Sequence, residues 1–219
     1  MIIMEAIDNM EKVDDITIIL GRGRDSNSYV IGDALIDPGS GQDIDYLKSS
    51  IQEAGIKMDD INKIVNTHCH FDHMGADKQL QDEYGYEIYM HPLDKQLVEQ
   101  KDEEATVAAS FGMTVPDLDI KDLNEGDEIN GYEVIHTPGH TQGGICLTNG
   151  KSLISGDTIF SGGNFGRTDL PTGNSQQMKE SIKKISDLDV IQLFPGHGPY
   201  AISTVAEQVS LALMIASRL

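Results

Sequence analysis

Short apolar runs alternate along the chain with longer amphipathic segments. β-Branched and other apolar residues in short runs predict strands, whereas apolar residues that recur at helical spacing predict helices. The short runs predict strands at 16–20, 28–31, 34–40, 61–67, 86–90, 127–130, 132–136, 144–149, 151–155 and 190–194. The longer segments predict helices at 42–54, at about 75–84, from Pro92 onward, at 175–185 and at 203–218.

The order of these elements indicates the class of fold. Strands come first, strand–helix pairs follow, and strands return near the end. This order fits two packed β-sheets covered by helices better than a singly wound parallel sheet. The charged segment 101–126 is expected to be a mobile segment near the functional site. The chain has 219 residues without a repeat or a linker, so we expect one domain over 1–219.

Composition restricts the partners of the protein. The formal net charge of −20 argues against nucleic acid and anionic membranes, since both require a positively charged surface. Two cysteines, Cys69 and Cys146, do not make a disulfide framework and predict reduced thiols. The first residues carry acidic side chains where an export signal would be basic, and no run has the length of a membrane span. We therefore expect a cytoplasmic protein, with homo-oligomer formation left open.

Three of the seven histidines lie within "NTHCHFDHMG", residues 66–75. In an extended chain, His68 and His70 point to the same side and can meet one metal ion, while Cys69 points away. Asp72 and His73 then fall in the turn that opens the next helix. One ion would be cramped among all four candidates, so the spacing favours two adjacent metal ions.

Three further candidates each follow a predicted apolar strand, on a turn next to glycine. They are His140 in "HTPGHTQG", Asp157 in "LISGDTIF" and His197 in "LFPGHGP". Turns at strand ends are where α/β architectures gather their sites, and glycine permits close approach of the backbone. Together with the first cluster they give seven candidate ligands.

The seven side chains can be divided between two ions and a bridging carboxylate. The predicted sets are His68, His70 and His140 for one ion, Asp72, His73 and His197 for the second, and Asp157 as the bridge. Nitrogen and oxygen donors suit zinc, which we expect first, and also iron or manganese. Two such ions would ionise a shared water near neutral pH, which indicates a hydrolytic centre.

The order of these residues resembles the signature H-x-H-x-D-H…H…D…H of the metallo-β-lactamase superfamily, over roughly residues 16–200. "NSYVIGDALIDPGS" (27–40) is similar to the family's first motif, which implies that Asp37 supports the ligand loops. "SGDTIFSGGNFGRTDLPTGN" (155–174) is similar to the glyoxalase II-like, or hydroxyacylglutathione hydrolase-like, branch. The resemblance implies an α+β fold, an αββα sandwich of two mixed β-sheets flanked by helices, with the metals at one edge of the sheets.

The resemblance also implies an activity on small-molecule thioesters. A metal-bridging hydroxide would attack the thioester carbonyl, and Asp72 would orient this hydroxide as well as bind metal. The thiolate leaves readily because the pKa of a thiol is only about 8.5, so no general acid is required. The alternative is a persulfide dioxygenase with one iron held by His68, His140 and Asp157. A metal-binding module without catalysis is a third reading.

Two basic residues, Arg167 and Arg218, bear on how the substrate would be bound. Arg167, in "FGRTD", aligns with a residue that glyoxalase II enzymes place near the thiol portion of the substrate. It would either contact a substrate carboxylate or form a salt bridge that holds the glycine-rich loop. After His197 the only basic residue is Arg218, so glutathione binding by basic residues of a C-terminal helical region, as in larger glyoxalase II enzymes, is not the expectation here. The thiol of the substrate is therefore left open.

Overall fold

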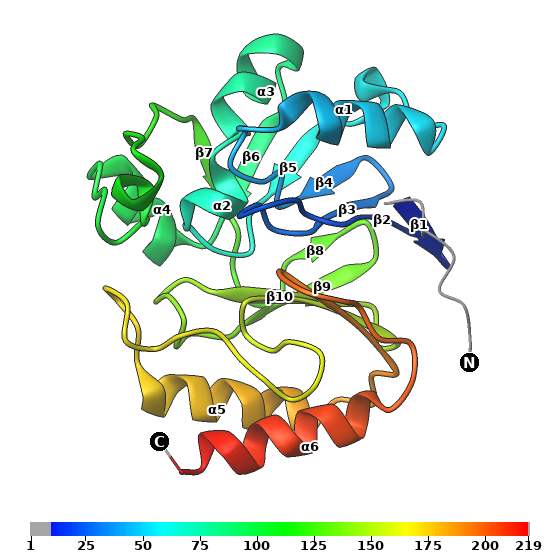
Figure 1. Ribbon diagram of the computed structural model, residues 1–219, viewed down its shortest axis with the longest axis vertical. Coiled ribbons are helices and arrows are strands. Elements are labelled where there is room, and N and C mark those ends of the chain that lie inside the picture. Colours follow the sequence, from blue (N-terminus) through cyan, green and yellow to red (C-terminus); the bar gives the residue numbers. More distant parts are fainter. Residues whose placement is uncertain (1–9, 219) are drawn as a thin grey trace.

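Two mixed β-sheets face each other in the computed structural model, which describes residues 10–218 (Figure 1). The first sheet has seven strands in sequence order, antiparallel from β1 to β4 and parallel from β4 to β7. Its strands are β1 (Met10–Val13), β2 (Ile16–Ile19), β3 (Ser28–Ile31), β4 (Ala34–Ile36), β5 (Lys63–Val65), β6 (Glu87–Met90) and β7 (Ile120–Asp122).

The second sheet has the order β12-β11-β10-β9-β8, with only the β11–β12 pair parallel. Its strands are β8 (Glu128–Ile129), β9 (Tyr132–His136), β10 (Ile145–Thr148), β11 (Ser152–Gly156) and β12 (Gln192–Pro195). Both sheets combine parallel and antiparallel pairs, as the sequence predicts.

Helices cover the outer faces of both sheets (Figure 1). The first sheet is flanked by α1 (Ile44–Glu53), α3 (Asp77–Tyr84) and α4 (Pro92–Glu99), and the second by α5 (Ser175–Ser186) and α6 (Val205–Ala216). Three shorter helices are η1 (Met58–Asp60), α2 (Phe71–Met74) and η2 (Ala108–Phe111). The arrangement confirms the predicted αββα sandwich. Within residues 10–218, no helix combines the length and apolar character that a membrane crossing requires.

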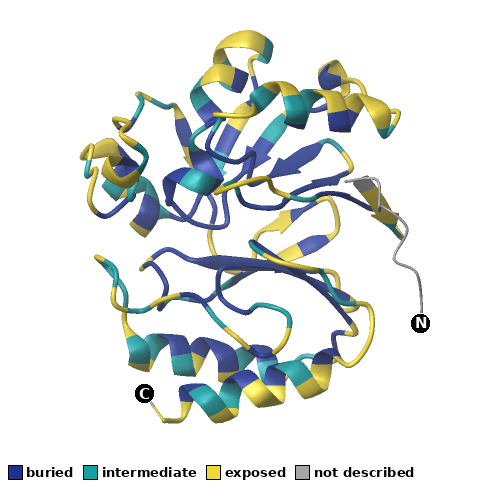
Figure 2. Ribbon diagram, viewed as in Figure 1, coloured by how far each residue is buried: buried dark blue, intermediate teal, exposed yellow. Residues whose placement is uncertain are grey.

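Apolar side chains fill three layers of core, one between the sheets and one under each set of helices. Figure 2 shows that the strands of both sheets carry many of the buried residues. Strand β3 shows why the central strands are continuously apolar: Tyr29 and Ile31 face the second sheet, whereas Val30 faces the helices. Tyr29 also donates a hydrogen bond across the sheets to the carbonyl of Pro195, at 2.6 Å. This bond joins the two sheets just before the turn that carries His197.

The structure differs from the prediction mainly at sheet edges. The sequence analysis missed β1 and β7, because edge strands carry charged residues such as Glu11 and Lys121 that hide the apolar pattern. The predicted helix at about 75–84 begins at Asp77, after the separate short helix α2. The segment 101–126 contains η2 and β7, and its predicted mobility stays a prediction. Residues 1–9 and residue 219 lie outside the described residues, so the predicted lack of an export signal at 1–9 is not addressed by the structure. The prediction of one domain over 1–219 also stays a prediction.

Candidate metal centre

All seven predicted ligands lie on segments that follow strands, five on connections and two, Asp72 and His73, in the short helix α2. His68 and His70 follow β5, and α2 continues directly from them with Asp72 and His73. The other three candidates come from the second sheet: His140 from the β9–β10 connection, Asp157 from the end of β11, and His197 from the end of β12. Four separate segments therefore bring imidazoles and carboxylates to one place.

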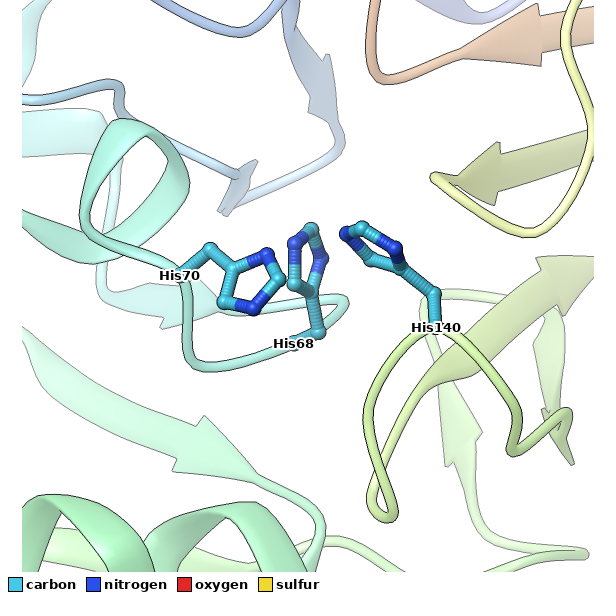
Figure 3. Close-up of side chains that lie close together, drawn as sticks. All are labelled: His68, His70 and His140. Carbon is cyan, nitrogen blue, oxygen red and sulfur yellow. The ribbon is translucent and has the colours of Figure 1, made fainter. Parts of the chain in front are cut away.

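His68, His70 and His140 form the first set (Figure 3). One nitrogen of each ring lies within 4.8 Å of the others, and the Nε2 atoms of all three rings are buried without a hydrogen-bond partner. The Nδ1 of His140 lies 2.8 Å from the main-chain oxygen of Arg167, so it donates its proton there and leaves a lone pair on Nε2. Buried, unpartnered lone pairs that converge on one point are suited to a metal ion.

Asp72, His73 and His197 form the second set. The Nε2 of His197 lies 3.1 Å from Oδ2 of Asp72 and 3.3 Å from Nε2 of His73. The Nδ1 of His73 contacts Oδ2 of Asp37 at 2.9 Å; because this carboxylate accepts, Nδ1 carries a proton, and Nε2, which faces the set, is the nitrogen available to a metal ion.

Asp157 lies between the two sets. Its Oδ2 is 3.4 Å from Nε2 of His140 and 3.8 Å from Nε2 of His197. Its Oδ1 is 3.4 Å from Nε2 of His73 and has no hydrogen-bond partner. Oδ2 thus lies near one histidine of each set and Oδ1 near a further histidine of the second set, so Asp157 lies between the sets, where the sequence predicts a bridge.

Electrostatics at the site favour metal-binding forms of these groups. Burial, together with neighbouring imidazoles, lowers the pKa of His68 well below its usual range and that of His70 to about 3, so both rings are neutral. Burial acts against a charged His73, but Asp37 and Asp157 raise its pKa well above the usual range. The site therefore supplies neutral nitrogen donors at His68 and His70. At His73 the carboxylates favour positive charge, which a divalent ion would supply in place of the ring proton.

Asp37 supports the site from behind. Its Oδ1 accepts a hydrogen bond from the main-chain N–H of Thr67 at 2.7 Å, and its Oδ2 accepts one from the Thr67 hydroxyl at 2.6 Å. The same Oδ2 contacts His73. Asp37 thus contacts both the start of the His68–His70 segment and the ring of His73.

Asp94, at the start of α4, is a buried residue that the sequence analysis missed. Its Oδ2 accepts hydrogen bonds from the N–H of Cys69 at 2.9 Å and the Thr141 hydroxyl at 2.7 Å, and its Oδ1 accepts one from the N–H of Gly143 at 2.5 Å. Burial raises the pKa of Asp94, whereas these donors act in the opposite direction. Asp94 joins the segment of His68 and His70 to that of His140. In the sequence it looks like an ordinary acidic residue at a helix start.

A hollow of about 450 Å³ opens over the cluster. Its floor includes cluster residues, and its walls are largely apolar: Val107, Phe111, Phe160, Phe165 and Leu170. Arg24 and Arg167 also line it. The guanidinium of Arg167 is paired with both oxygens of Asp169, at 2.9 and 2.8 Å, so the structure shows a salt bridge for this residue. A contact between Arg167 and the substrate stays a prediction.

Metal binding is expected to stabilise the fold markedly. Protein stripped with a chelator and then given Zn²⁺, Fe²⁺ or Mn²⁺ at about 1,000 times its Kd should gain about 4 kcal/mol. For a chain of this length that gain raises Tm by roughly 8–16 °C, measurable by differential scanning calorimetry. A His68→Ala variant is the control and should lose most of the increase. An equal increase in both proteins would contradict binding at this cluster.

Comparison with known proteins identifies the family and the relatives that the chain resembles. The family model of the metallo-beta-lactamase superfamily matches residues 21–197. The chain is 40% identical to the probable metallo-hydrolase MJ0888 of Methanocaldococcus jannaschii, covering 81% of this chain and 90% of the relative. It is 35% identical to the hydroxyacylglutathione hydrolase GloC of Haemophilus influenzae, covering 76% and 80%. A solved structure of TTHA1623 in a di-iron-bound form has a TM-score of 0.73 and 30% identity, covering 87% of this chain and 96% of that chain.

Proposed function

The chain belongs to the metallo-beta-lactamase superfamily as a metallo-hydrolase, and we propose that it hydrolyses small-molecule thioesters at the cluster centred on Asp157. The observation that carries this proposal is the pair of donor sets with one carboxylate between them, below an open hollow. The similarity to a hydroxyacylglutathione hydrolase supports a thioester as substrate.

Two divalent ions, when bound, would supply Lewis acidity and make water a nucleophile near neutral pH. We propose zinc first, with iron and manganese as alternatives; iron is present in the di-iron-bound form of TTHA1623. The first set of three histidines would hold one ion and the second set the other, with Asp157 shared between them.

The protein groups around the hollow would orient the attacking water and exclude bulk solvent. Asp72 is partly exposed where it lines the hollow, so its carboxylate can accept a hydrogen bond from the attacking water and orient it. The apolar walls would exclude bulk water from the acyl group and strengthen electrostatic interactions inside. A thiolate departs without protonation, so the leaving group needs no acid from the protein.

Thioester hydrolysis is tested on purified protein whose metal content has been measured. We expect the metal-loaded protein to release free thiol from acyl thioesters, detected with a thiol reagent, and the chelated protein to release almost none. The matched oxygen ester, with its poorer leaving group, should react much more slowly. Oxygen consumption with a persulfide, without thioester hydrolysis, would contradict the proposal and support the dioxygenase that uses His68, His140 and Asp157.

A further inference from the structure

The loop between β2 and β3 carries Arg24 to the hollow and is hydrogen-bonded to the metal centre. The N–H of Ser26 donates to the main-chain oxygen of Asp72 at 3.1 Å, and the N–H of Asn27 donates to that of Gly196 at 2.7 Å. The amide of Asn27 also donates to the carbonyls of Pro195 and Gly198, at 3.0 and 2.8 Å. The loop is thus held by both segments that supply the second set of donors.

The guanidinium of Arg24 is held over the hollow by protein contacts that leave its charge unpaired. It lies 3.7 Å from the centroid of the Phe111 ring, and its NH1 donates to the main-chain oxygen of Ser110 at 2.8 Å. No carboxylate oxygen of residues 10–218 lies within 4.0 Å of it. A guanidinium has five N–H donors, so most of its capacity for hydrogen bonds is free. Arg167, on the same hollow, differs because Asp169 neutralises it.

The unpaired guanidinium of Arg24 affects which substrates the hollow would attract. The protein has a formal net charge of −20, so its surface as a whole repels anions. The apolar walls of the hollow reduce the local dielectric and strengthen an ion pair formed against them. Apart from the metal centre, Arg24 is therefore the cationic side chain lining this hollow that is free to attract an anionic group of a substrate.

We propose that Arg24 binds an anionic oxygen group, a carboxylate or a phosphate, on the part of the thioester that lies away from the bond that is hydrolysed. This inference rests on the proposed thioester hydrolysis and narrows its substrate to anionic thioesters. The planar guanidinium, with paired N–H donors free, suits either group in a bidentate contact.

The test compares thioesters that differ only in a terminal carboxylate, phosphate or uncharged carboxamide. In the wild-type protein, KM should be lower for the anionic thioesters than for the carboxamide. In Arg24→Gln this preference should fall about 10- to 100-fold, because a charge-assisted hydrogen bond is lost. The change should lie in KM rather than in kcat, and Arg24→Lys should restore part of it. If the Arg24→Gln variant raises KM more for the carboxylate thioester than for the phosphate thioester, or the reverse, that difference identifies the anionic group that Arg24 binds.

Arg22→Gln is the matched control. Arg22 lies in the same loop, its guanidinium is 3.5 Å from the centroid of the Tyr46 ring, and it lines a different hollow. The control should keep the wild-type preference for anionic thioesters. Equal effects of the two variants, or a fall in kcat for every substrate without a change of preference, would overturn the proposal.

A binding measurement separates this inference from the proposed activity. Non-hydrolysable thioethers with the same terminal groups are titrated into the metal-loaded protein by calorimetry. Charge-selective weakening in Arg24→Gln, but not in Arg22→Gln, supports the anion site even if no thioester is hydrolysed. Equal affinities of wild type and Arg24→Gln for the anionic thioether would overturn it even if hydrolysis is found.

Discussion

Replacement of Asp157 by alanine is expected to lower kcat/KM for thioester hydrolysis by at least about 1,000-fold. Its Oδ2 lies near His140 of the first set and His197 of the second, and its Oδ1 lies near His73 of the second set. Its removal would disconnect the sets, and stabilisation of transition-state charge by the metals is worth several kcal/mol. Metal content should fall from about two ions per chain to about one or fewer, measured by mass spectrometry of the elements.

Asp169→Ala is the control for this experiment. Asp169 is an exposed carboxylate close to the hollow, paired with Arg167, and it does not belong to either donor set. Its removal should leave the metal content at the wild-type value. Full metal content together with full hydrolysis in Asp157→Ala would refute the bridging position and the two-metal proposal.

The fold and much of the site were predictable because the necessary signals are local. His68 and His70 lie two apart at the end of an apolar strand, and this spacing alone places them on one side of the chain. His140, Asp157 and His197 each follow an apolar run, so topology brings them to a common edge once the strands form sheets.

The missed residues act through contacts between segments distant in the sequence. Asp94 reaches residues 25 and 49 positions away, and nothing near it shows that its side chain is buried. Arg24 is in a glycine-rich loop that predicts only a turn. Its neighbour Phe111 comes from the segment 101–126, which the sequence placed near the site without indicating a contact with Arg24. Such positions depend on packing of the two sheets, which periodicity does not describe.

Substitution of Asp94 by asparagine should lower the stability of the fold and the affinity for metal more than the small change in side-chain shape suggests. Both oxygens of Asp94 accept hydrogen bonds, so an amide would place an NH₂ group against an N–H or a hydroxyl donor. Leaving such buried donors unsatisfied costs about 2–4 kcal/mol, which lowers Tm by roughly 4–16 °C. The segments of His68, His70 and His140 would also lose their connection, so metal affinity should fall about 10- to 100-fold.

Asp77→Asn is the control that tests whether the loss of stability depends on hydrogen bonds rather than on burial. Asp77 is as fully buried as Asp94, but its Oδ2 accepts one bond from Asn66 and its Oδ1 has no partner. Burial raises the pKa of Asp77 well above its usual range, so burial disfavours a charge at this position and a neutral amide replaces it with little loss. Calorimetry of the chelated variants and metal competition with a chelator measure both effects. Equal Tm and equal metal affinity in the two variants would show that Asp94 does not position the ligand loops, and that convergence of the strands alone holds the metal centre together.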